Sequence, residues 1–114
     1  MKAIEKFYKK DNYTIQKSIN IEEGLYTKLK EVGNNDYDAT ISELVNACVE
    51  DLLTKDELEF YEKPEGEIIL YRSIMLRREN VEALNKVSKE KRISVTRLVN
   101  MAIKEFLEDY EESK

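Results

Sequence analysis

The side chains best suited to hydrogen bonding recur at every second position in two similar stretches of the chain. The alternate positions of residues 13–21 and 68–76 carry Gln16, Ser18 and Asn20, and then Tyr71, Ser73 and Met75. Amide and hydroxyl groups donate and accept hydrogen bonds, whereas the Met75 thioether is only a weak acceptor. Such a row could contact a polar partner, and it also suits a strand surface that faces water. The pattern alone leaves both interpretations open.

Catalytic and metal-binding chemistry finds few suitable residues in this chain. Its 114 residues include no histidine and one cysteine, Cys48, so zinc sites and histidine-based catalysis lack ligands and bases. The neighbouring acids Glu22 and Glu23 fit the first turn of a helix, where the helix dipole favours negative charge. Cys48 lies on an apolar helical stripe and fits a small core residue. We therefore expect no enzyme, no cofactor and no metal site.

The polar rows belong to two copies of one sequence unit. Shifting residues 13–21 by 55 positions places Lys17 on Arg72, Ser18 on Ser73 and Ile19 on Ile74. Apolar residues alternate with the polar ones in both copies, which predicts half-buried strands over 14–21 and 68–77. Two copies of a small unit indicate a fused dimer rather than a solenoid.

Two helices are predicted after each strand. In the first copy they cover 22–32, ended by the turn signal at 33–36, and a stretch opened by the capping box Thr40 to Glu43. In the second copy they cover 78–88, followed by a turn at 89–92, and a stretch capped by Ser94. Asn46 shares the second helix but is expected to point away from its apolar stripe.

The predicted fold class is mainly α with one short two-stranded antiparallel β-ribbon, in the order β-α-α-β-α-α. A lone strand would leave its ladder groups unpaired, so the two strands of one chain are expected to pair, with four helices covering one face. Pairing of each strand with its own copy in a second chain is the alternative. The predicted divisions are a basic arm at 1–12, repeat one at 13–55, a linker at 56–67, repeat two at 68–108 and an acidic tail at 109–114.

Charge is divided unevenly between the two copies. Residues 13–62 carry 12 acidic and 4 basic side chains, whereas residues 68–104 carry 3 acidic and 9 basic ones. This asymmetry indicates a polyanionic partner for the second copy, with a solvated surface as the alternative. We see no secretory signal and no run of membrane-spanning length, and a single thiol fits a reducing compartment, so we expect a cytoplasmic protein.

The arrangement resembles a known family. The alternating strands that end at Ile21 and Leu76, and the second helices that open with Leu44-Val45 and Leu98-Val99, are similar to those of the ribbon-helix-helix proteins, the Arc, MetJ and CopG class of bacterial and phage repressors. The resemblance covers residues 14 to about 107, twice, as in tandem members such as TraY. It implies an intramolecular pseudo-dimer that regulates transcription by placing its ribbon in the major groove of double-stranded DNA.

The resemblance also implies which residues contact DNA. The base-reading residues would be Gln16, Ser18, Asn20, Tyr71, Ser73 and Met75. The phosphate-binding residues would be Lys17, Thr40, Ile41, Ser42, Arg72, Arg92, Ser94, Val95, Thr96 and Arg97. Because Asp36, Asp38 and Glu43 flank the first helix end while Arg92 and Arg97 flank the second, we expect lopsided docking on the second repeat. The two unlike strands predict an asymmetric DNA site.

Two further partners are expected as alternatives or additions. Pseudo-dimers could associate with one another on an operator, as many relatives do. A protein-interaction module on the same fold, such as an antitoxin that wraps a toxin, is the competing function. The acidic first repeat and acidic tail would suit a basic protein partner of that kind.

Overall fold

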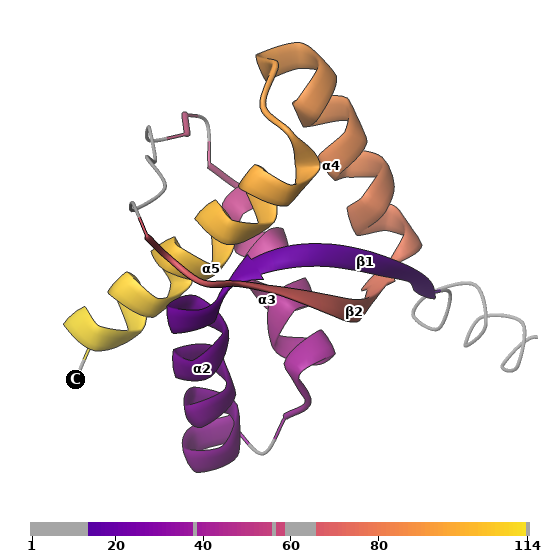
Figure 1. Ribbon diagram of the computed structural model, residues 1–114. Coiled ribbons are helices and arrows are strands. Elements are labelled where there is room, and N and C mark those ends of the chain that lie inside the picture. The colour runs from indigo at the N-terminus through magenta and orange to yellow at the C-terminus, as the bar shows by residue number, and fades with distance from the viewer. Residues whose placement is uncertain (1–13, 38, 56, 59–65, 114) are drawn as a thin grey trace, which may run out of the picture.

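The computed structural model describes residues 14–37, 39–55, 57–58 and 66–113. The predicted basic arm and most of the predicted linker lie outside these residues. The described elements are β1 Thr14–Glu22, α2 Glu23–Val32, a π-helical segment Gly33–Tyr37, α3 Ile41–Leu53, β2 Ile69–Arg77, α4 Arg78–Lys91 and α5 Val95–Glu112. Figure 1 shows the two strands side by side in front, with α3 and α5 behind them and α2 and α4 leaving in opposite directions.

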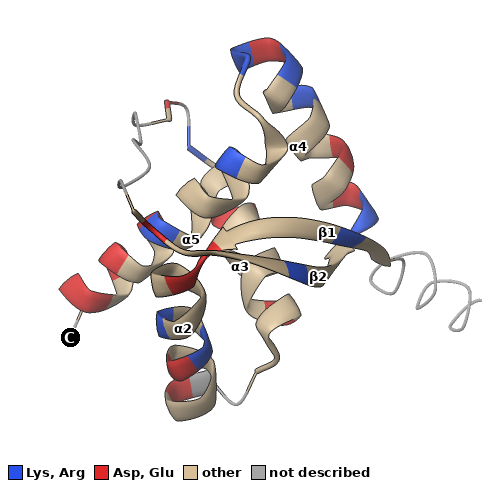
Figure 2. Cartoon of the chain, in the orientation of Figure 1, with Lys and Arg blue, Asp and Glu red and all other residues tan. Residues whose placement is uncertain are grey.

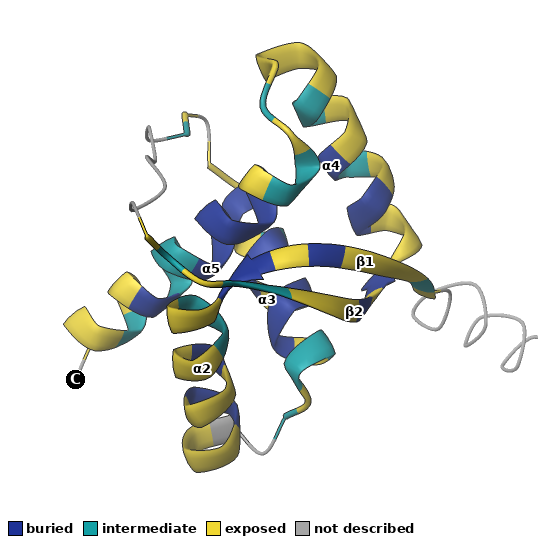
Figure 3. Ribbon diagram, in the orientation of Figure 1, coloured by how far each residue is buried: buried dark blue, intermediate teal, exposed yellow. Residues whose placement is uncertain are grey.

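The two strands form one antiparallel sheet, and its centre lies between Ser18 and Ser73, which are paired. The alternation of side chains gives this sheet two unlike faces. Ile19, Ile21 and Ile74 are buried beneath it against the helices, whereas the opposite face is exposed (Figure 3). The helices therefore cover one side of the ribbon and leave the other side open.

The core forms where the apolar stripes of the helices meet the inner face of the ribbon. Its fully buried members include Leu29 of α2, Leu52 of α3, Leu84 of α4, and Leu98 and Ile103 of α5. Burying a side chain of this size stabilises the fold by about 1.5–3 kcal/mol, so one shared core holds both repeats together. In the part of the chain that the structure describes, every helix is too short or too polar to span a lipid bilayer.

The fold class predicted from the sequence is wrong as stated. The ribbon is not short, because each strand has nine residues, more than the usual length of about five to six. The element order also contains a π-helical segment between α2 and α3. The structure has four α-helices and one two-stranded antiparallel sheet, in an order compatible with two tandem ribbon-helix-helix units.

The π-helical segment explains why the two copies lose their register by one residue. The helical stretch from Glu23 to Tyr37 is one residue longer than its counterpart from Arg78 to Lys91. A π-helical turn accommodates an extra residue within a helix because its hydrogen bonds span five residues. α2 ends at Val32 as predicted, but the chain does not turn at Gly33. Gly33 has right-handed helical angles and opens the π-helical segment, and its carbonyl accepts from the Ala39 amide at 3.3 Å.

Three predicted boundaries in the second repeat also need correction. The turn expected at 89–92 is shorter, because α4 continues to Lys91 and only Arg92 takes the left-handed conformation, with φ 58°. β2 begins at Ile69 rather than at residue 68. The tail expected from residue 109 is helical as far as Glu112, where Tyr110 remains half-buried.

The start of α2 is capped by a residue from far along the chain. Its N-cap residue, Glu22, makes no side-chain capping bond. The Gly24 amide instead donates to Oε1 of Glu67 at 3.1 Å, and the Glu23 amide donates to the Ile68 carbonyl at 2.8 Å. A carboxylate at this helix end is favoured by the helix dipole, so the segment that enters β2 helps to hold α2 in place.

Replacing Gly33 with alanine should destabilise the fold by about 1–3 kcal/mol, the usual cost of overpacking. A Cβ atom at this position would overlap Leu44 Cδ1 and lie 3.0 Å from the Ala39 carbonyl oxygen. Gly24→Ala is the matched control, since its Cβ would lie 3.4 Å from the flexible end of Glu67. Urea denaturation should show a lower midpoint for Gly33→Ala alone; equal midpoints would contradict the packing argument.

Candidate nucleic-acid interface

The open face of the ribbon carries all six residues predicted to read bases. The strand register pairs Gln16 with Met75 and Asn20 with Tyr71, on either side of the central Ser18–Ser73 pair. All six side chains are exposed, and none of the helices that the structure describes lies over them. The structure therefore brings these residues together on one surface, although they come from positions more than 50 residues apart.

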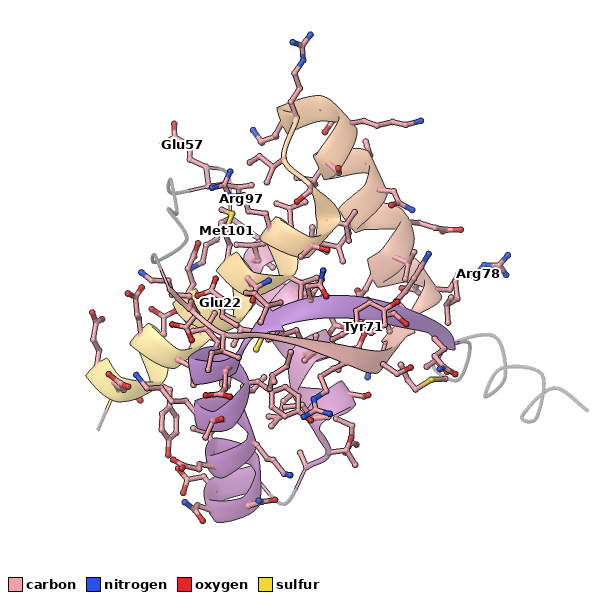
Figure 4. The ribbon with its side chains drawn as sticks, viewed as in Figure 1. Glu22, Glu57, Tyr71, Arg78, Arg97 and Met101 are labelled. Atoms are coloured by element: carbon pink, nitrogen blue, oxygen red, sulfur yellow. The ribbon has the colours of Figure 1, made fainter. Side chains whose placement is uncertain are left out.

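The chemistry of this surface differs from one end to the other. At the end that carries Gln16 and Met75, Gln16 Nε2 donates to Ser73 Oγ at 2.5 Å. This end therefore holds a preformed polar pair beside the Met75 thioether. At the other end the Tyr71 side chain is 71% exposed beside Asn20, and Figure 4 shows it on the ribbon. An exposed aromatic ring is available for contact with an apolar or planar group. The two ends of the ribbon would thus favour different neighbours.

Two predicted phosphate-binding residues lie on the opposite parity of the strands. Lys17 is paired with Ile74, Arg72 is paired with Ile19, and both basic side chains are exposed. The Arg72 guanidinium carbon lies 5.2 Å from the ring centre of Tyr26, a cation–π distance. Both cations therefore share the parity of the buried residues yet remain exposed to solvent.

Asn46 locks one edge of the ribbon. Its Nδ2 donates to the carbonyls of Ser42 and Met75, each at 2.9 Å, and its Oδ1 accepts from the Arg77 amide at 2.8 Å. Asn80 Nδ2 also donates to Oδ1 at 2.8 Å. Asn46 is buried at the packed face of α3, so the prediction that it points away from the apolar stripe is wrong. Its amide instead replaces a third strand at this edge, where backbone groups would otherwise remain unpaired.

Asn100 locks the other edge in the same way. Its Nδ2 donates to the Asn20 carbonyl at 2.9 Å, and its Oδ1 accepts from the Glu22 amide at 3.1 Å. Each asparagine therefore holds the strand of the opposite repeat. The sequence signal for this role was the shared Leu-Val-Asn triplet, in which a polar residue recurs within an apolar stripe.

At the start of α3 a carboxylate already occupies the helix end. The Thr40 amide donates to Glu43 Oε1 at 2.9 Å, and the Glu43 amide donates to Thr40 Oγ1 at 3.1 Å, which completes a capping box. The backbone hydrogen bond from Thr40 lowers the pKa of Glu43. Ser42 Oγ accepts from the Met75 amide at 3.0 Å. Of the three predicted phosphate-binding residues at this helix end, Thr40 and Ser42 are thus hydrogen-bonded within the protein. Ile41 has no side-chain group that could form such a bond.

The start of α5 has the opposite electrostatic character. Ser94 caps it by accepting from the Arg97 amide at 3.1 Å, and Arg97 occupies the position that corresponds to Glu43. A guanidinium has no acceptor atom, so it cannot close a capping box. A hollow of about 320 Å³ lies here, lined by Asn20, Glu22, Ile69, Ser94, Thr96, Arg97 and Asn100. Of the residues predicted to bind phosphate, Ser94, Val95, Thr96 and Arg97 share this helix end.

Arg92 is less closely associated with this site. It ends α4, two residues before the Ser94 cap, and its side chain is exposed. Figure 2 shows basic and acidic residues interspersed along α4, a basic residue at the start of α5 and acidic residues at the far end of α5. Within the described residues, no three metal-ligating side chains gather into a cluster.

The Cys48 thiol should react with thiol reagents at least about a thousandfold more slowly in the folded protein than in the unfolded chain. Its side chain is fully buried, and burial raises its pKa to about 12, so labelling requires opening of the core. Stopped-flow labelling with an aromatic disulfide, with and without urea, measures both rates. Rapid labelling without urea would show that the core around α3 opens readily.

We compared the chain with protein-family models, with curated proteins and with solved structures, and none of them matched it.

Proposed function

We propose that this protein binds double-stranded DNA sequence-specifically and regulates transcription, with its ribbon inserted in the major groove. The observation that carries this proposal is the open ribbon face, on which six side chains lie exposed while every helix packs on the other side. The major groove is about 12 Å wide and admits a two-stranded ribbon. Nine residues at about 3.4 Å each give a ribbon long enough to reach several base pairs.

The side chains on this face have suitable chemistry. Glutamine and asparagine can make paired hydrogen bonds to adenine, and serine can donate or accept, while methionine can contact a thymine methyl group. The outward residues of the two strands are unlike, so an asymmetric site is expected. The hydrogen bonds of Asn46 and Asn100 to the strand edges support the proposal. They hold the ribbon rigid, so its side chains are preorganised and binding costs less conformational entropy.

Phosphate contacts should concentrate on the second repeat. Three features support this: the open hollow at the start of α5, the Arg97 cation within it, and the Glu43 carboxylate that closes the start of α3. A helix N-terminus attracts anions through its free amides and its dipole. A bound phosphate would compete with Glu43 at α3 but would be joined by Arg97 at α5.

Selection of bound sequences from a random DNA pool tests the proposal. The wild-type protein should retain a defined asymmetric sequence, and Gln16→Ala and Ser73→Ala should each relax the preference at nearby positions by about tenfold. Asn85→Ala is the matched control, since it removes an exposed amide from α4. If neither ribbon variant changes the retained sequences, the ribbon does not read DNA.

A protein partner is the second candidate function. The far end of α5 carries Phe106 and Tyr110 among acids, and shallow hollows on either side are lined by Asp36 and Glu111 and by Asp51 and Asp109. This surface would suit a basic protein, as an antitoxin would require. Gel shifts at low and moderate salt separate the two functions: steep loss of retardation with salt supports DNA binding, and no sequence-selective retardation supports the protein partner.

Both candidates place the protein in the cytoplasm, where operator DNA and a toxin would be accessible. Association of several molecules along one operator is compatible with the first candidate. The DNA selection reports this as well, because tandem copies of the retained sequence at a fixed spacing would indicate it.

A further inference from the structure

The two repeats carry opposite charges at corresponding positions around their shared interface. Shifts of 55 residues in the strands and 54 in the second helices align Glu22 with Arg77, and Glu50 with Lys104. Glu43 and Arg97 are a further such pair. In these places an acid of the first repeat becomes a base in the second, although the backbone plan is repeated.

One of these positions makes an ion pair between the repeats. Arg77, at the end of β2, contacts Glu50 of α3 at 2.8 Å, and Asn80 of α4 also donates to this carboxylate at 2.9 Å. A pseudo-twofold axis relates the two repeats. The position equivalent to the contact of residue 77 with residue 50 is therefore the contact of residue 22 with residue 104. The sequence places an acid at 22 and a base at 104, so the charges at this second site are opposite by position. The ion pair that the structure gives Lys104 is with Glu108 of its own helix, at 3.0 Å.

A second ion pair also joins the repeats, although its acid Glu105 corresponds to another acid, Asp51, in the first repeat. Lys55, just after α3, lies 2.6 Å from Glu105 and 3.8 Å from Asp109 of α5. The hydrogen bond that Lys55 donates to Glu105 raises the pKa of Lys55, which keeps it charged. Lys55 corresponds to Asp109 under the 54-residue shift, so two second repeats would bring acids together here.

We propose that these charges make the two repeats obligate complements, so that repeat one recognises repeat two and both reject a copy of themselves. Pairing two first repeats would place Glu22 against Glu50. Pairing two second repeats would place Arg77 against Lys104, and Asp109 against Glu105 and a second Asp109. Because exchange between two chains requires both like pairs at once, the repulsions add, whereas the pairing within one chain keeps the Arg77–Glu50 and Lys55–Glu105 ion pairs.

This inference concerns assembly and does not depend on DNA binding. If it holds, each chain folds as a monomer in which the acidic first repeat always pairs with the basic second repeat. Any partner that contacts the ribbon then meets one asymmetric surface with two unlike ends. Symmetric dimers of either repeat do not compete with it.

A single introduced thiol at the centre of the ribbon tests the proposal. Ser18→Cys lies opposite residue 73, so a short bifunctional maleimide can join the introduced thiols of two chains only if two first strands pair. After refolding from urea at several protein concentrations, Ser18→Cys should stay monomeric on a denaturing gel. Ser18→Cys with Ser73→Cys should form a link within one chain, and the wild type controls for buried Cys48.

Exchanging charges between equivalent positions should then reverse the preference. Glu50→Lys with Lys104→Glu keeps the net charge, creates repulsion within the chain and creates attraction between like repeats. In the Ser18→Cys background it should raise the covalent dimer about tenfold, as expected when several surface charges act together. Lys89→Glu with Glu90→Lys is the matched control, because it reverses two exposed charges at the end of α4.

Either of two results would overturn the proposal. One is efficient cross-linking of Ser18→Cys with the native charges. The other is a folded exchange variant that cross-links no more than the control. If the exchange variant does not fold, Glu50→Lys alone replaces it: a higher dimer fraction than the control supports the proposal, and an unchanged fraction refutes it.

Discussion

Asn46→Ala should lower the free energy of unfolding by about 3 kcal/mol, since removing one partner from a buried hydrogen bond costs about 1–3 kcal/mol and several are lost together. Asn46 is 5% exposed and bonds to Ser42, Met75, Arg77 and Asn80. Its loss would leave the edge of β2 unpaired. For a domain with a total stability of about 5–15 kcal/mol, this is a large fraction.

Chemical denaturation followed by circular dichroism measures this change. Asn46→Asp keeps the volume and the acceptor but places a carboxylate beside two carbonyl oxygens, so it should also destabilise the protein. Asn85→Ala removes an exposed asparagine from the neighbouring helix and should change stability by less than about 0.5 kcal/mol. An Asn46→Ala variant that matched this control would show that the edge bonds contribute little.

The two equivalent asparagines, Asn46 and Asn100, should contribute unequally to the free energy of unfolding. Asn100 bonds to Asn20, Glu22 and Thr96, but Leu25 stands in the first repeat where Asn80 stands in the second. Asn100→Ala therefore removes fewer side-chain partners. It should cost less than Asn46→Ala, by roughly the 1 kcal/mol that one hydrogen bond contributes.

Arg97→Gln should weaken DNA binding about tenfold at moderate salt and reduce the slope of log affinity against log salt by about one, as expected for one lost phosphate contact. The reason is the position of Arg97 in the hollow at the start of α5, beside Ser94 and Thr96. Fluorescence anisotropy with the selected DNA at a series of salt concentrations measures both quantities.

Glu43→Gln provides the matched comparison, because residue 43 occupies the equivalent place in the first repeat. Glutamine can still close the capping box, so the helix end is kept while one negative charge is removed. This variant should bind DNA as tightly as wild type or more tightly. Lys89→Gln controls for the loss of any surface cation. If Glu43→Gln and Arg97→Gln weaken binding equally, phosphate contact is not concentrated on the second repeat.

Several features of this protein could be predicted from local sequence. Alternation with a period of two predicted the strands and their open face, and the capping box from Thr40 to Glu43 predicted the start of α3. Such patterns act over a few residues, so they can be read without knowing the fold. The fused repeat also indicated that two strands of one chain could pair, which the sheet topology shows.

Other features depended on residues that are distant in sequence. The cap of α2 by Glu67, the edge bonds of Asn46 and Asn100, and the Arg77–Glu50 ion pair join positions 27 to 80 residues apart. The π-helical segment likewise depended on packing, because Gly33 lies close to Leu44 of α3. The sequence by itself determined where the helices and strands form and which strand face stays polar. Only the tertiary structure decided which distant groups hold them together, since hydrogen bonds and ion pairs depend on distances that no local pattern specifies.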